Sequence, residues 1–130
     1  MHTSPATQPS GVQDLIAHPE RIEPVLQPIV DLRTCRITGY EGLTRIGGET
    51  SAGPAEWFAA ARAAGLSTQL ETVALDRMLE VVDRVPTDMF LAVNVSPATI
   101  STGDVHTRLA AVDHPLVIEL TEHPDSSQPL

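Results

Sequence analysis

The sequence contains no lysine, and this absence shapes the charge of the whole chain. All eight basic residues are arginines, and 17 acidic residues give the 130-residue chain a net charge of −9. Binding to nucleic-acid polymers and to anionic membranes depends on basic patches. We therefore expect neither a nucleic-acid polymer nor a membrane surface as a partner.

Cysteine and long apolar runs are equally scarce. Cys35 is the single cysteine, so the chain cannot form an internal disulfide, which suits a reducing compartment. No stretch approaches the roughly twenty apolar residues that span a membrane. The opening residues, MHTSPATQPSG, also lack the apolar core of a secretory signal. These absences predict a soluble, cytoplasmic protein.

Aromatic residues make up only 3% of the chain, and Trp57 and Phe58 stand side by side in a segment with helical periodicity. Buried aromatic side chains pack in cores more often than they recognise ligands. Both residues are predicted core anchors, with ligand stacking as the alternative.

The length leaves room for one domain at most. Residues 1–20 are polar and rich in proline, serine and threonine, so we expect a flexible N-terminal segment with too little apolar surface to offset the entropy of ordering. Residues 21–123 carry the patterns of a folded domain, and residues 124–130 form a polar C-terminal tail.

The stretch LQPIVDLRTCRITGYEGLTR, residues 26–45, holds the most informative pattern. Aliphatic and β-branched residues favour strands over residues 25–32 and 37–46, with a turn between them. A carboxylate beside Leu43 is costly to bury unless a cation meets it. Glu41 is therefore a functional acid, or it is exposed or paired with Arg45, and both interpretations stay open. Alternation gives the second strand one face that holds Ile37, Gly39, Glu41, Leu43 and Arg45.

Helices should follow this second strand. Pro54 suits the first turn of a helix that stops at Gly65, and Ser67 or its neighbour can cap a second helix that runs to about Val85. The apolar run over residues 89–96 predicts a buried strand. Residues 97–112 favour one or two helices with a break near Gly103, and residues 115–121 favour a last strand.

Alternating strands and helices predict an α/β protein with a parallel sheet. Glu41, Asn94 and Glu119 each lie in or near the last part of a predicted strand, where sites of this class form. Asn94 also has an ordinary interpretation as a turn former or helix cap. Three hard oxygen donors of this kind favour Mg²⁺ or Mn²⁺.

Three motifs carry a family resemblance. QPIVDLRTCRITGYEGLTR, LAVNVSP at residues 91–97 and VIELTE at residues 117–122 resemble the EAL-domain family, bacterial phosphodiesterases that linearise cyclic di-GMP. Its signature tripeptide stands here as Glu41-Gly42-Leu43. The resemblance implies a TIM-like (β/α) barrel, metal ligation by Glu41, Asn94 and Glu119, and substrate contacts by Gln27, Leu43 and Arg45. In the turn, Cys35 replaces the usual glycine, and a positive φ there would cost about 1 kcal/mol.

The resemblance covers only the N-terminal half of that domain, in the order strand-strand-helix-helix-strand-helix-strand. The family's later paired aspartates, lysine, further glutamate and glutamine have no counterparts here. We therefore expect a truncated EAL-like protein that cannot hydrolyse cyclic di-GMP unaided and acts through binding or association. The alternatives are a metal-dependent phosphodiesterase completed by a partner chain or second copy, and a non-functional structural fragment.

A half-barrel leaves strand edges open and exposes the inward-facing residues of its strands. These residues are Ile29, Leu43, Phe90, Ala92 and Val117. Association would hide them from water, so we expect a homodimer or a complex with another chain.

Overall fold

The computed structural model describes residues 11–48 and 52–121 of the chain. Residues 1–10 of the flexible segment predicted over residues 1–20, and the polar tail predicted over residues 124–130, lie outside the described residues. The described elements are α1 (Val12–Ala17), the 3₁₀ helix η1 (Pro19–Arg21), β1 (Ile22–Asp31), β2 (Arg36–Ile46), α2 (Pro54–Ala64), α3 (Ser67–Leu79), the 3₁₀ helix η2 (Val82–Arg84), β3 (Phe90–Val95), α4 (Pro97–Ile100), α5 (Gly103–Ala110) and β4 (Leu116–Leu120).

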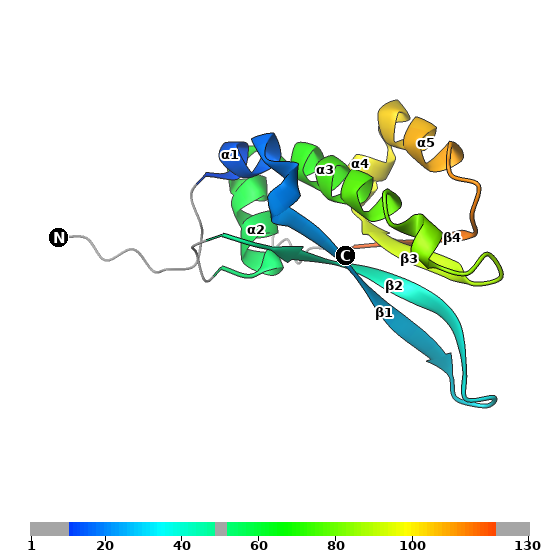
Figure 1. The fold of residues 1–130 in the computed structure, drawn as a ribbon. Helices are drawn as coiled ribbons and strands as arrows, with labels where there is room; N and C mark the ends of the chain where they lie inside the picture. The colour runs from blue at the N-terminus through cyan, green and yellow to red at the C-terminus, as the bar shows by residue number, and fades with distance from the viewer. Residues whose placement is uncertain (1–10, 49–51, 122–130) are drawn as a thin grey trace, which may run out of the picture.

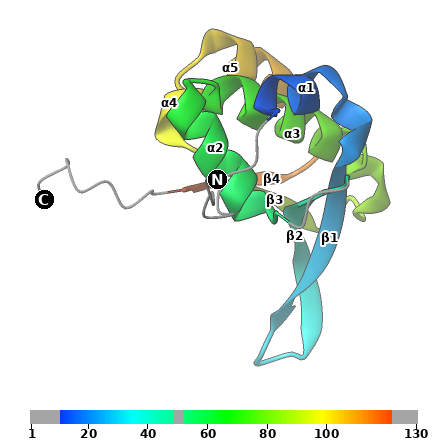
Figure 2. The ribbon, with the colours of Figure 1, turned by 90° about the vertical axis from the view of Figure 1, so that its left-hand side faces the viewer.

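The strands form one mixed sheet in the order β1-β2-β3-β4. β1 and β2 are antiparallel, whereas β2, β3 and β4 run parallel to one another. The helices gather on one face of this sheet (Figures 1 and 2). The predicted α/β class and element order are confirmed. Because β2, β3 and β4 are parallel, their carboxyl ends meet at one edge of the sheet, as the predicted site requires.

The β1–β2 hairpin extends well beyond the rest of the sheet. β3 pairs with β2 only over Gly39 to Glu41, so the part of the hairpin around its turn, residues 30–38, has no strand beside it among the described residues. This part, called the arm below, leaves the body on the side away from the helices (Figure 1). A register shift between Ile29 and Val30 makes Val30 the partner of Ile37. The prediction that Ile37 shares a face with Glu41 is therefore wrong, because the bulge resets the alternation.

The arm ends in a tight turn at Cys35. Its backbone has φ 58°, in the left-handed region, and its N–H donates to the carbonyl oxygen of Asp31 at 2.7 Å. Cys35 is exposed, so no packed neighbour compels this conformation. The turn therefore carries the local cost that the sequence predicted for a residue with a Cβ at this point, about 1 kcal/mol.

α2 starts where the sequence indicated, whereas the predicted cap of the second helix at Ser67 or Thr68 is wrong, because the cap position is Leu66 and has no side-chain hydrogen bond. α2 has Pro54 in its first turn and ends before Gly65, whose φ of 74° suits a glycine. α3 begins at Ser67 but ends at Leu79, so its predicted extension to Val85 is wrong. The chain continues there as η2, and Val85 still packs in the core. Apolar spacings of three and four residues occur in both helix types, so the sequence pattern did not separate them.

α1 and the first two residues of η1 fall inside residues 1–20, where the sequence predicted a loosely ordered segment. Val12 and Leu15 are buried in this part of the chain. They pack in the same core group as Trp57 of α2 and Leu70 of α3. Two well-spaced apolar residues therefore suffice to dock one short helix, although the segment as a whole is polar.

Two groups of buried side chains hold the helix layer to the sheet. The first surrounds Trp57 beneath α1, α2 and α3, and Trp57 is only 2% exposed, as a core anchor should be. The second fills the space between α3, α5 and the parallel strands, with Leu91 and Val93 of β3 near its centre. Each large buried side chain of this kind contributes about 1.5–3 kcal/mol, so packing dominates the attachment of the helices.

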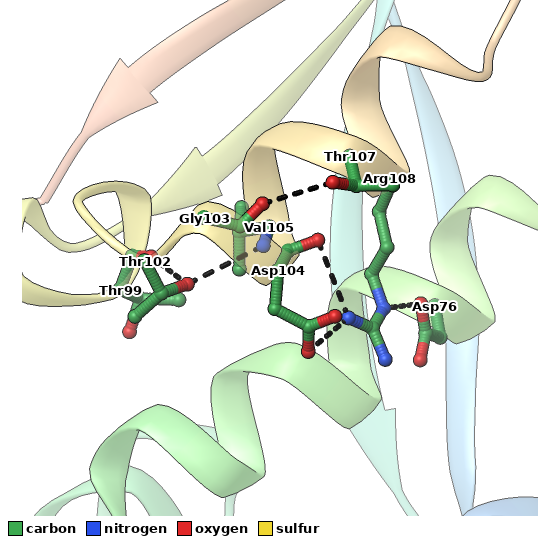
Figure 3. A network of polar contacts seen from close by, with 8 residues as sticks. All are labelled: Asp76, Thr99, Thr102, Gly103, Asp104, Val105, Thr107 and Arg108. Atoms are coloured by element: carbon green, nitrogen blue, oxygen red, sulfur yellow. Dashed lines mark hydrogen bonds and ion pairs between the residues drawn. The ribbon is translucent and has the colours of Figure 1, made fainter.

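A polar contact also ties α5 to α3 (Figure 3). Arg108 Nε donates to Asp76 Oδ1 at 2.6 Å, and the same guanidinium pairs with Asp104 one turn earlier on α5. The hydrogen bonds to Asp104 and to Asp76 raise the pKa of Arg108 above its ordinary value. At the start of α5, Thr102 Oγ1 accepts the N–H of Val105 at 3.3 Å and caps the helix.

Replacing Arg108 with methionine tests this contact. The substitution keeps the aliphatic stem and removes both ion pairs, so the free energy of unfolding should fall by about 1 kcal/mol. Urea denaturation followed by circular dichroism measures the change. Arg84→Met, at an exposed position of η2, is the control and should stay within about 0.5 kcal/mol of the parent. Equal losses in the two variants would contradict a role for the α3–α5 contact.

Candidate site on the open face of the sheet

One face of the sheet carries no helices (Figure 2) and is called the open face below. The predicted site residues all lie on it, because Asn94 alternates with Val93 and Val95, which are buried against the helices. Strand register places them there: Gln27 lies opposite Glu41, and Asn94 lies opposite Glu119. Directly paired residues of neighbouring strands project to the same face. The open face consists of Glu23, Val25, Gln27, Ile29, Glu41, Leu43, Arg45, Phe90, Ala92, Asn94, Val117 and Glu119.

Glu41, Asn94 and Glu119 come from three adjacent strands. The amide Nδ2 of Asn94 lies 3.5 Å from Oε2 of Glu41, a long and weak hydrogen bond. Glu41 is half-buried in the middle of β2, whereas Asn94 and Glu119 are exposed. A half-turn of the Asn94 amide would point its oxygen, instead of its nitrogen, toward the space between the two carboxylates. The structure thus brings the three side chains together, and their role as metal ligands stays a prediction.

The predicted substrate-contacting residues flank this group. Gln27 is exposed and directly opposite Glu41, while Leu43 follows two residues later on the same face. Arg45 Nη1 lies 3.5 Å from Glu23 Oε1 of the neighbouring strand. The alternative in which Glu41 pairs with Arg45 is therefore not what the structure shows, because Glu23 is the residue opposite Arg45.

The inward-facing apolar residues divide into exposed and covered ones. Leu43 is 36% exposed and Val117 is 42% exposed, as expected for a face without helices. Ala92 is only 1% exposed, because its short side chain lies low between the larger neighbours of β2 and β4. Phe90 is half-buried over the backbone of Gly39. The prediction of a water-exposed apolar face therefore holds at Leu43 and Val117, holds only in part at the half-buried Ile29 and Phe90, and is wrong at Ala92.

A cavity of about 530 Å³ opens beside the open face, between the carboxyl ends of the strands and helices α2 and α3. Leu43 and Asn94 line it, so it adjoins the predicted site directly. The rest of its lining is formed by Gly42, Thr44, Pro54, Ala55, Phe58, Arg62, Glu71, Ala74, Leu75, Met78, Val93 and Thr121.

The sequence did not indicate the helical side of this cavity. Glu71 accepts the backbone N–H of Ser96 at 2.9 Å and so fixes the loop after β3. Phe58 is only half-buried and lines the cavity, in contrast to the neighbouring Trp57. In the sequence, Glu71 is one polar residue of an amphipathic helix among several. No local signal distinguishes it, because its significance comes from the β3 loop that it meets.

The donor set on the open face fits a divalent metal only in part. Two carboxylates and one amide supply hard oxygen ligands of the type that Mg²⁺ and Mn²⁺ prefer. Among residues 11–48 and 52–121, no three or more histidine, cysteine, aspartate and glutamate side chains cluster as a metal site. Any ion held by these residues would therefore take much of its coordination from water.

Solved structures resemble this arrangement. The YkuI protein of Bacillus subtilis, with an EAL domain and in complex with substrate c-di-GMP and calcium, aligns with a TM-score of 0.66 and 16% identity over 90% of this chain and 32% of its own. The FimX EAL domain from Pseudomonas aeruginosa bound to c-di-GMP aligns with a TM-score of 0.65 and 20% identity over 84% of this chain and 48% of its own.

An EAL domain protein from Listeria monocytogenes EGD-e aligns with a TM-score of 0.67 and 20% identity, covering 96% of this chain and 52% of its own. The chain thus spans about a third to a half of these structures. No curated protein matches the chain. The structural likeness establishes the fold as part of a TIM-like (β/α) barrel, which confirms the predicted architecture.

The one-sided sheet and its open face define the class of the protein as a partial (β/α) barrel. The EAL domain family model matches residues 12–129, and the chain therefore belongs to the EAL domain family.

The signature tripeptide has glycine in place of alanine at Gly42, and the structure explains why a glycine suits this position. A Cβ at Gly42 would lie 2.6 Å from Sδ of Met78 in α3. This distance is far below van der Waals contact, so Met78 occupies the space that an alanine side chain would need. Gly42 and Met78 are therefore coupled through packing, and both line the cavity.

A double-mutant cycle tests this coupling. Gly42→Ala should lower the free energy of unfolding by about 1–2 kcal/mol through overpacking, and Met78→Ala should lower it by about 2–3 kcal/mol through a cavity. The double variant should lose less than the two single losses combined, because each change relieves the other. Leu75→Ala, paired with Gly42→Ala, is the control and should be additive within about 0.5 kcal/mol. Additive losses of unfolding free energy for Gly42→Ala and Met78→Ala would contradict a packing contact between the two residues.

Proposed function

We propose that this protein binds cyclic di-GMP at the carboxyl ends of β2, β3 and β4, and that it does not hydrolyse the dinucleotide unaided. The observation that carries this proposal is the junction of two surfaces at Leu43 and Asn94: the polar open face on one side and the cavity on the other. Membership of the EAL domain family and the c-di-GMP complexes of two structural neighbours support the ligand.

The cavity has the size and chemistry to receive one guanine base. Its volume of about 530 Å³ falls in the usual range of ligand sites, about 300–1,000 Å³. Phe58 and Leu43 supply apolar surface for the faces of a purine. The Glu71 carboxylate has two oxygens and accepts one backbone N–H through Oε1, so it retains acceptor capacity for guanine N–H groups.

The phosphates would lie over the open face, near Arg45. Its side chain is 70% exposed and its partner Glu23 is 60% exposed, so their ion pair is of the weak surface type. Breaking the ion pair between Arg45 and Glu23 therefore costs little free energy. The Arg45 guanidinium can then donate two parallel hydrogen bonds to a phosphate. Gln27 lies opposite Glu41 on the neighbouring strand and can donate to a ligand oxygen from its amide.

Glu41, Asn94 and Glu119 would hold one Mg²⁺ or Mn²⁺ with water in the remaining positions. Such an ion neutralises phosphate charge and polarises bound water when present. Phosphodiester hydrolysis in two-metal sites needs ligands for a second ion as well. The predicted ligands Glu41, Asn94 and Glu119 offer only three oxygen-donating side chains for both ions, so we propose binding without turnover. We also propose a cytoplasmic location, in line with the single cysteine. None of the described helices is long and apolar enough to cross a membrane.

Hydrolysis after association is the second candidate. The open face lacks a covering layer among the described residues, and the solved neighbours extend over about twice to three times the length of this chain. A partner chain or a second copy could supply further oxygen ligands to this face. This candidate is favoured because the uncovered surface includes Glu41, Asn94 and Glu119, the side chains predicted to bind metal.

Isothermal titration with cyclic di-GMP tests the binding proposal. We expect saturable binding to the parent chain and a dissociation constant about tenfold higher for Arg45→Ala, because a charge-assisted phosphate contact is lost. Arg84→Ala removes an arginine outside the site and serves as the control. Absence of binding at millimolar dinucleotide would instead support the alternative of a structural fragment.

Turnover is measured on the same samples. With Mg²⁺ or Mn²⁺ added, the linear dinucleotide should not accumulate above the level seen with Glu41→Ala. Sustained hydrolysis by the isolated chain would overturn the claim of binding without turnover and leave the claim of binding intact.

Metal binding forms a separate prediction. Paramagnetic Mn²⁺ titration should give a dissociation constant on the order of millimolar, typical of sites with few charged ligands. Glu41→Gln and Glu119→Gln should each weaken binding several-fold, since each removes one of two carboxylates. Asp88→Asn, at an exposed loop position, should leave it unchanged. Tight binding that survives both glutamate changes would place the ion elsewhere.

A further inference from the structure

The guanidinium of Arg21 contacts α1, the residues after β2 and helix α2 at once. Its Nη1 donates to Oδ2 of Asp14 in α1 at 3.2 Å, and its Nε donates to the carbonyl oxygen of Gly47 at 3.1 Å. The central carbon of the guanidinium lies 5.5 Å from the centre of the Trp57 ring in α2. This distance is within the range of a cation–π contact. Arg21 therefore joins the end of β2 to α2.

The backbone around Arg21 holds the side chain in this position. Arg21 ends η1, and its N–H donates to the carbonyl oxygen of His18 at 3.0 Å. Its own carbonyl oxygen accepts the N–H of Gly47 at 2.9 Å, so backbone and side chain both bind the same residue. Gly48 leaves space for the guanidinium, because a Cβ there would lie 2.7 Å from Nη2 of Arg21.

The contacts of Arg21 differ in strength. The side chain of Asp14 is 65% exposed, so its ion pair with Arg21 is weakened by water. Trp57 is only 2% exposed, and the guanidinium covers its ring where water is largely excluded, which strengthens a cation–π contact. A planar guanidinium can stack on a ring and donate to the Gly47 carbonyl at the same time. The contacts to Trp57 and Gly47 are therefore the ones that hold β2 and α2 together.

Both elements that Arg21 joins form walls of the ligand cavity. The cavity is lined by Gly42, Leu43 and Thr44 from β2 and by Pro54, Ala55 and Phe58 from α2. Gly47 follows Thr44 closely in the chain, and Trp57 directly precedes Phe58. A helix moves as a rigid unit over such short distances, so a contact at Trp57 also fixes the position of Phe58.

We propose that Arg21 is a positioning residue for the cavity: by holding the end of β2 against α2, it sets the separation of the two walls between which a purine would lie. Arg21 itself is not among the residues that line the cavity, so it would act through its neighbours and not by touching the ligand. The identity of the ligand rests on the proposed function, whereas the contact between β2 and α2 does not.

The competing interpretation is that Arg21 stabilises the fold and has no effect on the cavity. Arg77 of α3 provides the matched comparison. Its Nε donates to the carbonyl oxygen of Ile22 at 2.9 Å and its Nη1 pairs with Glu80 at 2.7 Å, so it also joins a helix to the sheet. Its side chain is 27% exposed and that of Arg21 is 26% exposed. Arg77 does not line the cavity and contacts neither β2 nor α2 through these bonds.

The first measurement uses the ligand-free chain. Trp57 is the single tryptophan, so its fluorescence reports the position of α2 against Arg21 without a label. Arg21→Met should raise the acrylamide quenching constant of Trp57 about threefold, because the first turns of α2 can then open locally. Arg77→Met should leave the quenching constant at the parent value. Equal quenching in the parent and in Arg21→Met would reject the contact between β2 and α2.

The second measurement is isothermal titration with cyclic di-GMP, at a temperature where circular dichroism shows the parent and both variants fully folded. Arg21→Met should raise the dissociation constant about fivefold, because displaced walls no longer contact both faces of the purine. Arg77→Met should bind like the parent, even where urea denaturation shows that it loses as much stability as Arg21→Met.

The outcomes separate this inference from the proposed function. Weaker binding that is equal in the two variants, or stronger quenching of Arg21→Met with unchanged binding, would mean that Arg21 has a structural role alone and would overturn the inference. Absence of binding by the parent chain would reject the proposed function. The quenching comparison would then decide by itself whether Arg21 holds β2 against α2.

Discussion

The attachment of all the helices to one face of the sheet is the constraint on which the rest of this structure depends. Burial of Leu91, Val93 and Val95 against α3 and α5 fixes which side of β3 is covered. Since side chains alternate, the same burial turns Ala92 and Asn94 to the opposite face. The position of Asn94 in the site is thus a consequence of the core, because the burial of Val93 and Val95 against the helices turns Asn94 toward the open face.

This arrangement gives the open face two incompatible requirements. Glu41, Asn94 and Glu119 need access to water and ligand, while Leu43 and Val117 beside them are better covered. In a closed barrel the facing strands would cover such apolar residues and supply further polar ones. In this chain the same surface is the one proposed to bind ligand and the one left without a covering layer among the described residues.

The arm and the cavity are two structural features that the sheet alone would lack. The arm exists because β3 pairs with only a short part of β2, which leaves the far end of the hairpin to water. The cavity exists because α2 and α3 meet the carboxyl ends of the strands, where Gly42 admits the side chain of Met78. Neither feature reduces the burial of the core side chains, because the residues of both are held by backbone pairing and by neighbouring helices.

The sequence by itself determined the strands, the start of α2 and the shared face of the site residues, because period-two alternation and glycine or proline signals are local. It also indicated Cys35 as a strained turn residue. Tertiary structure decided the partner of Arg45, the end of α3 at Leu79 and the position of Glu71 against the β3 loop. These depend on register and packing between segments far apart in the chain, which no local pattern encodes. The bulge at Thr38 is a further case, since one extra residue in β2 reverses the face of Ile37 without changing the composition of the strand.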